Sequence, residues 1–96
     1  MNEPRNPDDP SGATMKAWIT QMAKHVKSID SKHLLTVGLE GFYAHNSKSK
    51  YIDSNADWGQ GQQGTDFLEH HMIDGIDFAT YLVDPHHVLG DNAPLI

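Results

Sequence analysis

Apolar residues recur at helical spacing along one segment near the N-terminus. From residue 15 onward they fall at positions i, i+3, i+4, i+7, i+11 and i+14, and polar residues occupy the opposite face. Ser11 precedes the pattern as a candidate N-cap, and Asp30-Ser31-Lys32 ends it. The sequence therefore predicts an amphipathic helix over about 11–29, whose apolar face carries Met15, Trp18, Ile19, Met22, Val26 and Ile29.

Two short apolar runs predict buried strands. The first covers 34–37 and leads into Gly38, and the second covers 76–80. Between them, Thr65 and Asp66 offer a cap for a short helix through about Met72, with Glu69 placed three residues beyond Asp66. A helix followed by a strand, twice over, indicates an α/β architecture.

The remaining segments read as loops. Residues 6–10, Asn-Pro-Asp-Asp-Pro, are rich in turn formers, and 84–96 has no regular pattern. Residues 38–64 form a connection of about 27 residues, and connections beyond roughly 15 residues in compact domains tend to be functional or disordered. If a strand precedes Glu3, the order of elements is βαβαβ, as in a parallel sheet or barrel.

Composition narrows the classes of function. Seven Lys and Arg stand against thirteen Asp and Glu, for a formal net charge of -6, and no basic run is present. This balance argues against nucleic acid and anionic membranes as partners. No apolar stretch approaches the roughly 18 residues of a membrane span, and the N-terminus does not resemble a signal peptide.

The acid/base-type motif Asn2-Glu3-Pro4-Arg5 stands at the very start of the sequence. Packed backbone on both sides is needed to hold a catalytic Glu, so we interpret the sequence as an internal or truncated piece of a larger enzyme. Barrel active sites form at the carboxyl ends of the strands. We therefore expect Glu3, Glu40 and the loop after Thr80 to converge.

A series of short motifs runs in one order over nearly the whole chain, to about residue 85. They are Asn2-Glu3-Pro4-Arg5, Asp9-Pro10-Ser11-Gly12, Ala17-Trp18-Ile19, Val26-Lys27-Ser28-Ile29-Asp30, Lys32-His33-Leu34-Leu35, Val37-Gly38-Leu39-Glu40-Gly41-Phe42-Tyr43, Gly64-Thr65-Asp66-Phe67 and Gly75-Ile76-Asp77-Phe78-Ala79-Thr80. Together they closely resemble the plant endo-β-1,4-mannanases of glycoside hydrolase family 5.

The resemblance implies a fragment of a (β/α)8 TIM barrel, from about the end of strand 4 to just past strand 6, with residues 1–96 as one partial catalytic domain. It implies a secreted enzyme that hydrolyses β-1,4-linkages in mannans, galactomannans and glucomannans with retention, without cofactor, metal or partner protein. Glu3 matches the general acid/base, and Asn2 matches the neighbour that contacts the sugar 2-hydroxyl. Trp58 is a weaker candidate for stacking on sugar.

The retaining mechanism also requires a nucleophilic carboxylate about 5 to 5.5 Å from the acid. In the family this Glu lies on the seventh strand, and the chain ends soon after the sixth, so we expect the isolated chain to be inactive. Glu40, at the other strand end, is interpreted as structural or substrate-side. The family His and Tyr after strand 6 are replaced by Leu82 and Asp84, which leaves a non-catalytic or degenerate family member as the alternative.

Other patterns carry weaker hypotheses. Residues 59–64 match G-x-G-x-x-G, and Asp84 lies 20 residues beyond, but no apolar strand precedes the first glycine, so a flexible loop is favoured over a nucleotide site. The seven histidines include the pairs His70-His71 and His86-His87, whose neighbouring side chains diverge, so surface or packing roles are favoured over a metal site. Trp18 is expected in the core. The loop aromatics Tyr43, Tyr51 and Trp58 could stack on sugars or pack within the loop.

Overall fold

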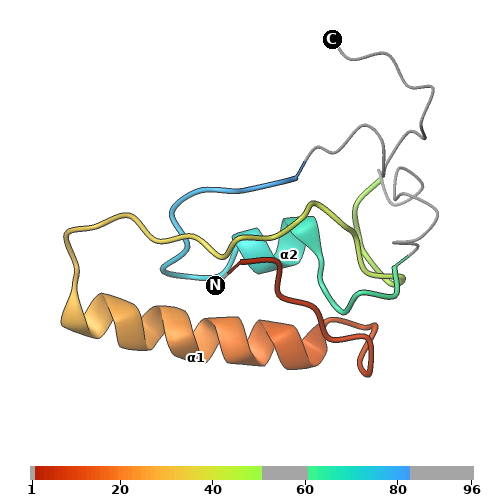
Figure 1. The fold of residues 1–96 in the computed structure, drawn as a ribbon, viewed down its shortest axis with the longest axis horizontal. Coiled ribbons are helices and arrows are strands. Elements are labelled where there is room, and N and C mark those ends of the chain that lie inside the picture. Colours follow the sequence, from red (N-terminus) through yellow and green to blue (C-terminus); the bar gives the residue numbers. More distant parts are fainter. Residues whose placement is uncertain (1, 51–60, 83–96) are drawn as a thin grey trace, which may run out of the picture.

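The computed structural model describes residues 2–50 and 61–82. In this part of the chain, helix α1 spans Ala13–Ile29 and helix α2 spans Phe67–His71. Extended segments at 2–4, 34–40 and 76–82 pass over one side of α1, and α2 lies on the same side (Figure 1). The described helices are shorter and less apolar than a membrane span requires.

Helix α1 follows the periodicity closely, but its N-cap is Gly12 and not Ser11. Gly12 has a φ of 80°, a left-handed conformation that favours glycine. The side chain that caps the first turn is Asp9, whose carboxylate accepts hydrogen bonds from the Thr14 N–H at 2.8 Å and from the Ser11 hydroxyl at 2.5 Å. These bonds, first from the Ser11 and Thr14 side chains, hold the pKa of Asp9 below its usual range.

The two predicted strands lie side by side and parallel, but neither forms a regular ladder. Backbone bonds join the Asp77 N–H to the Leu35 carbonyl at 2.8 Å and the Leu82 N–H to the Glu40 carbonyl at 3.0 Å. Between these two backbone hydrogen bonds, side chains make the bonds that a regular ladder would make with the backbone. The Asp77 carboxylate accepts the Leu35 N–H at 2.8 Å, and the Thr80 hydroxyl lies 3.2 Å from the Val37 carbonyl. Because side chains replace ladder bonds, the prediction of regular strands is wrong, although the placement is right. The prediction that both are buried is also wrong, since Leu34 is 75% and Phe78 is 47% exposed.

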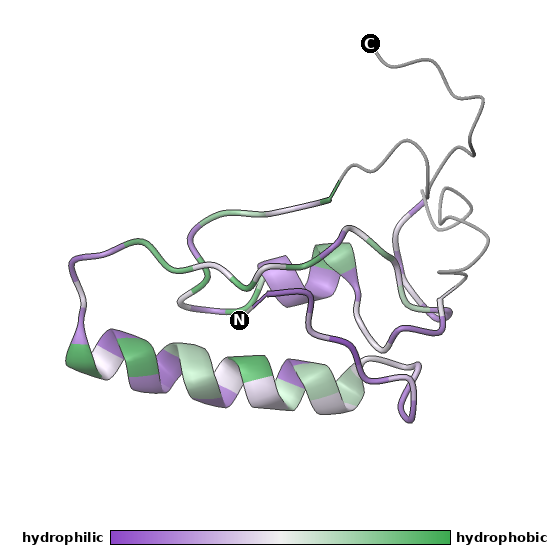
Figure 2. Ribbon diagram, in the orientation of Figure 1, coloured by the Kyte–Doolittle hydropathy of each residue, from purple (hydrophilic) through white to green (hydrophobic). Residues whose placement is uncertain are grey.

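The core lies between the first half of α1 and these extended segments. It is formed by the buried residues Met15, Ile19, Val37, Leu39 and Ile73. Trp18 and Ile76 pack against it while remaining partly exposed, so the expectation of a core Trp18 is confirmed in part. Apolar residues continue along the second half of α1 (Figure 2), where Val26 is 38% and Ile29 is 75% exposed.

Helix α2 is capped as expected and is fastened to the start of α1. Asp66 is its N-cap, and the carboxylate accepts hydrogen bonds from the Glu69 N–H at 2.8 Å and the Ala44 N–H at 3.0 Å. His70, 1% exposed, receives the Asp66 N–H at Nδ1 and lies 3.0 Å from the Gly12 carbonyl through Nε2. Since Nδ1 accepts, Nε2 carries the proton and donates to Gly12.

Two glycines of the glycine-rich run are packing positions. A Cβ on Gly64, which has a φ of 72°, would lie 2.1 Å from the Asn6 carbonyl oxygen. A Cβ on Gly61 would lie 2.6 Å from the His45 backbone. The described end of this run therefore packs against the loops that carry Asn6 and His45, while Gly59 and Gln60 lie outside the described residues.

Candidate active site

Asn2 and Glu3 lie beside Gly38 of the neighbouring segment 34–40. Asn2 forms a parallel bridge with Gly38, and the Glu3 N–H donates to the Gly38 carbonyl at 2.9 Å. The Glu3 side chain is exposed. The bridge anchors the backbone of the candidate acid to the neighbouring segment and leaves its carboxyl accessible to a ligand.

Glu3 has a φ of 51°, the one positive value among the described non-glycine residues. A side chain in this left-handed region costs roughly 1–2 kcal/mol relative to a right-handed one. Strained residues of this kind occur preferentially at active sites, where surrounding contacts hold them in place. The strain therefore singles out Glu3 independently of any sequence motif.

Arg5 and Glu40 form a bidentate ion pair next to Glu3. Arg5 Nε and Nη2 each lie 2.6 Å from one oxygen of the Glu40 carboxylate. The Glu40 side chain is 4% exposed, whereas that of Arg5 is 40% exposed. The Glu40 hydrogen bond, assisted by the charges of Glu40 and Glu3, raises the pKa of Arg5 above its usual value despite desolvation. Both Glu40 oxygens are thus engaged, which supports a structural role for this residue.

The third extended segment reaches the same edge. The Leu82 N–H donates to the Glu40 carbonyl, and the Leu82 side chain is 50% exposed there. Three segment ends therefore meet, carrying Asn2 and Glu3, then Glu40, then Leu82. This is the convergence of Glu3, Glu40 and the chain after Thr80 that is expected from the sequence.

Several candidates lie outside the described residues, namely Tyr51, Trp58, Asp84, His86 and His87. Of the loop aromatics, Tyr43 packs edge-on against Phe67 with ring centroids 6.0 Å apart. Sequence reasoning did not assign Arg5 a role. Its position two residues after Glu3, in the Asn-Glu-Pro-Arg motif, is the signal that could have suggested one.

Both described members of the histidine pairs serve packing. His71 Nδ1 lies 2.8 Å from the Phe67 carbonyl, and its Nε2 accepts the Thr80 N–H at 3.1 Å. His70 is hydrogen-bonded to Gly12 and Asp66, so both nitrogens of each ring are hydrogen-bonded to backbone groups. Within residues 2–50 and 61–82, no three His, Cys, Asp or Glu side chains gather as metal ligands.

The chain is similar in sequence to plant mannanases. It is 56% identical over 81 residues to mannan endo-1,4-beta-mannosidase 7 of Arabidopsis thaliana, covering 83% of this chain and 18% of that protein. It is 51% identical over 80 residues to mannan endo-1,4-beta-mannosidase 8 of Oryza sativa subsp. japonica, covering 83% and 21%. Mannan endo-1,4-beta-mannosidase 2 of the same rice is 47% identical over 90 residues, covering 93% and 20%. No protein-family model matches the chain.

The fold agrees with these relatives. The structure of the hyperthermostable endo-1,4-beta-D-mannanase from Thermotoga petrophila RKU-1 superposes with a TM-score of 0.77 and 35% identity, covering 91% of this chain and 25% of that one. The match covers a fraction of a TIM-barrel mannanase. The chain is homologous to part of the plant mannan endo-1,4-beta-mannosidases, of which it spans about a fifth.

Proposed function

We propose that this chain is the acid/base segment of a retaining β-1,4-mannan hydrolase, extending from the end of the fourth barrel strand to just past the sixth. Glu3 is the proton donor, and Asn2 contacts the 2-hydroxyl of the sugar. The observation that carries the proposal is the position of Glu3 at the edge where three segment ends meet, with its backbone held at a φ of 51° by the Gly38 hydrogen bond.

In this mechanism the Glu3 carboxyl gives its proton to the glycosidic oxygen as the bond to the anomeric carbon breaks. A second carboxylate, from the seventh strand of the barrel, bonds to that carbon and forms a glycosyl-enzyme. Glu3 then takes a proton from water, whose oxygen displaces the carboxylate. The Arg5–Glu40 pair restrains the backbone that leaves Glu3, which keeps the carboxyl in one position between the two steps.

The proposed substrates are mannan-type polysaccharides, as the names of the relatives indicate. Secretion, which the resemblance implies, forms part of the proposal. The exposed Glu3 at an open edge suits a long polymer, because such a chain must lie across the surface of the enzyme.

The test uses a completed barrel, in which this segment is joined to the remaining strands of a related mannanase with Leu82→His and Asp84→Tyr restored. Glu3→Gln should lower mannan hydrolysis by about 10²–10⁴-fold, the usual contribution of a general acid. Cleavage of an activated aryl mannoside should fall far less, since that leaving group needs no proton to depart. Glu69→Gln, a matched change on α2, should leave both rates near the parent values. Equal losses on both substrates in Glu3→Gln would reduce Glu3 to a sugar-positioning role.

A polypeptide of these 96 residues alone should not hydrolyse mannan, because both carboxylates are needed. Reducing-end release from a galactomannan measures this directly. A rate above background that disappears in Glu3→Gln would overturn the expectation.

A second candidate, a degenerate family member, is favoured by Leu82, whose side chain, unlike its backbone N–H, can neither donate nor accept a hydrogen bond at the site edge. The completed barrel with Leu82 and Asp84 retained separates the two candidates. Activity close to that of the restored barrel would count against degeneracy, whereas activity only after restoration would support it.

A further inference from the structure

His71, on α2, holds the third extended segment by a backbone group. Its Nε2 accepts the Thr80 N–H at 3.1 Å, and its Nδ1 lies 2.8 Å from the Phe67 carbonyl. Since a carbonyl only accepts, Nδ1 carries the proton and donates to Phe67, and the lone pair of Nε2 receives Thr80. The Phe67 ring packs edge-on against the imidazole, with ring centroids 4.8 Å apart. The bond to Thr80 therefore requires the neutral ring in one tautomer.

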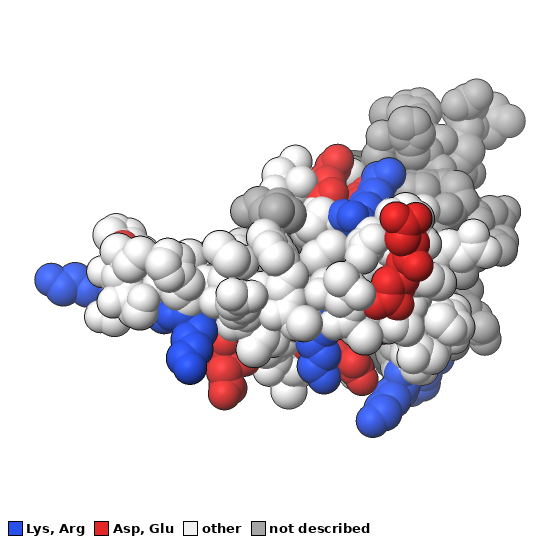
Figure 3. All heavy atoms as spheres, turned by 90° about the horizontal axis from the view of Figure 1, so that it is seen from below, with Lys and Arg blue, Asp and Glu red and all other residues white. Residues whose placement is uncertain are grey.

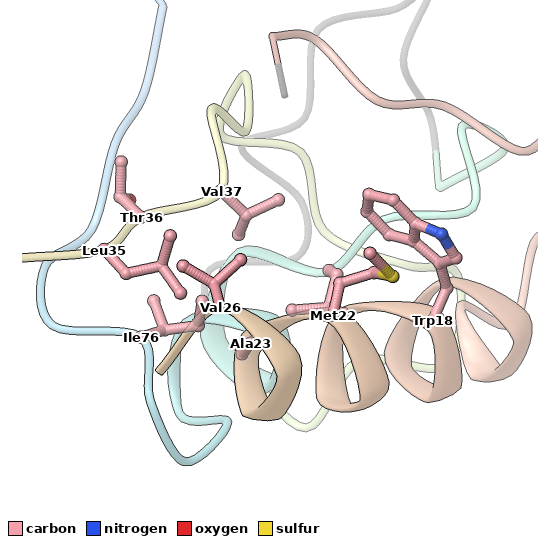
Figure 4. Close-up of a pocket in the computed structure, with 9 residues that line it drawn as sticks. Trp18, Met22, Ala23, Val26, Leu35, Thr36, Val37 and Ile76 are labelled. Atoms are coloured by element: carbon pink, nitrogen blue, oxygen red, sulfur yellow. The ribbon is translucent and has the colours of Figure 1, made fainter. Parts of the chain in front are cut away.

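The two ends of the third extended segment are held by different chemistry. At the first end, Ile76 lines the apolar groove between α1 and 34–37 (Figure 4), and Asp77 forms an ion pair with Lys27. The hydrogen bond from Lys27 is the main reason that the pKa of Asp77 lies below its usual range, so this carboxylate stays charged in mild acid. At the last end, the Thr80 N–H is bound by an imidazole, which does take up a proton in acid.

Thr80 connects this imidazole to the candidate site. The Thr80 hydroxyl lies 3.2 Å from both the Val37 and the Leu39 carbonyls, which belong to the neighbouring segment. Two residues beyond Thr80, the Leu82 N–H donates to the Glu40 carbonyl at 3.0 Å. The Glu40 carboxylate forms the ion pair beside the candidate acid. A displacement of the Thr80 backbone would therefore disturb the edge at which the three segments meet.

Protonation of His71 reverses the character of its contact with Thr80. Nε2 then becomes a donor that faces the Thr80 N–H, and this N–H loses its acceptor. Burial lowers the pKa of His71 below 6.5 and the Phe67 bond opposes the shift, with no charge of the described residues contributing to it. The ring is therefore neutral near pH 7. The titratable residues on the elements packed against it are Tyr43, Glu69, His70, Asp77 and Tyr81.

We propose that His71 is a positioning residue for the candidate site: its neutral ring holds the end of the third extended segment against Glu40, and its protonation releases that end. The consequence for rate rests on the proposed mannan hydrolysis. The release itself does not, because Thr80 loses its acceptor whether or not the barrel cleaves a sugar. The completed barrel should accordingly lose activity reversibly in acid while it remains folded.

The structural test uses the ¹⁵N-labelled completed barrel carrying Glu3→Gln, in which catalysis plays no part. The Thr80 amide signal should titrate with the same midpoint as the His71 imidazole signals, below 6.5. His71→Gln supplies an oxygen that accepts a hydrogen bond but takes up no proton in this range, so the Thr80 signal should keep its neutral-pH position. His71→Leu supplies no acceptor, so this signal should not titrate. The matched control is His25→Gln at an exposed position, which should titrate like the parent.

The rate test restores Glu3 and measures kcat/KM for mannan across the same pH range. The ratio of the parent value to the His71→Gln value should fall at least about fivefold as the ring protonates, because a buried N–H is left without a partner. A constant ratio in an active barrel would overturn the positioning role. So would a Thr80 amide that ignores ring protonation, or a barrel that unfolds before the ring protonates. A barrel without activity at any pH would count against the proposed function, and the Thr80 titration would still decide whether His71 releases the segment.

Discussion

The two ends of helix α1 are stabilised in different ways. At the first end, the Asp9 carboxylate caps the turn, His70 donates to the Gly12 carbonyl, and Ile19 is 2% exposed. At the second end, Ile29 is 75% exposed, and Lys27 tethers the helix by hydrogen bonds to Asp77 at 2.5 Å and to the His33 carbonyl at 2.9 Å. The first end is packed and capped by residues of this chain. The second end is held by polar side-chain bonds, but its apolar side chains are incompletely buried.

The contrast shows which stabilising contacts these 96 residues supply by themselves. Caps need only a few nearby groups, and the chain provides them. Apolar burial needs surrounding layers, and in the described residues nine large hydrophobic side chains are exposed while eight apolar side chains are buried. Charged residues of both signs are interspersed over the face seen in Figure 3. No patch of a single sign on that face is available to bind a charged partner and so offset the incomplete apolar burial.

The largest effect concerns folding of the 96-residue polypeptide, which we expect not to fold stably alone. Ordering costs on the order of 1.5 kcal/mol per residue, and the incomplete burial at the second end of α1 leaves this cost poorly offset. The check is the amide NMR spectrum and thermal melt of the purified monomer. Dispersed signals with one cooperative melt would show that the packed end suffices.

Gly64→Ala should be the most damaging single substitution near the packed end. The new Cβ would lie 2.1 Å from the Asn6 carbonyl oxygen, at a φ of 72°. We expect a loss of at least about 3 kcal/mol in the free energy of unfolding of the completed barrel, measured by urea denaturation.

Gly75→Ala is the matched control for Gly64→Ala. Its φ is 93°, but the nearest atom to the new Cβ is the Ala23 Cβ at 3.3 Å, a tight contact that a small shift relieves, so the backbone conformation carries most of the penalty. A cost of about 1–2 kcal/mol is expected. Similar costs for the two variants would mean that the loop at Asn6 shifts easily to make room for the new Cβ.

Ile19→Ala and Ile29→Ala make the same change at the two ends of one helix. Ile19 is 2% exposed and Ile29 is 75% exposed. In the completed barrel, Ile19→Ala should cost about 2–5 kcal/mol because it leaves a cavity. Ile29→Ala should cost about 1 kcal/mol or less. Equal losses in urea denaturation would show that the second end becomes as tightly packed as the first.

The smallest effect is a pH dependence that arises from His70. Burial lowers the pKa of His70 below 6.5, although the Gly12 hydrogen bond, Asp66 and Glu69 oppose the shift and Lys16 adds to it. The unfolded chain therefore binds more protons, and stability should fall as the pH drops below about 6.5. Protonation of Nδ1 would also break the bond from the Asp66 N–H.

Urea midpoints of the completed barrel at about pH 7.5 and about pH 5 measure this dependence. His70→Gln should reduce the difference between the two midpoints, whereas the matched change at the exposed His25 should preserve it. His71, whose pKa burial also lowers, supplies part of the remaining slope. If the difference between the two midpoints is unchanged in His70→Gln, His70 is not the source of the pH dependence.

Local features of the fold were predictable from the sequence. The spacing of Met15, Ile19 and Val26 identifies α1, and the Asp66 cap with Glu69 identifies α2, because helix periodicity and capping depend on neighbours a few residues apart. The sequence pattern indicates Ser11 as the cap of α1, whereas Asp9 reaches across five residues to Thr14, which is longer than the usual capping pattern. The strands were located but not their irregularity, since Asp77 and Thr80 replace ladder bonds through contacts 42 and 43 residues apart.

By itself, the sequence determined the helices, the order of the segments and the likeness to mannanases that marks Asn2 and Glu3. The tertiary structure alone decided that Arg5 engages Glu40 across 35 residues, that Glu3 adopts a left-handed backbone and that His70 is buried beneath Gly12. The reason is physical. Periodicity and caps are encoded by residues close together in the chain, whereas ion pairs, strain and burial depend on which distant segments meet, and no local pattern specifies that.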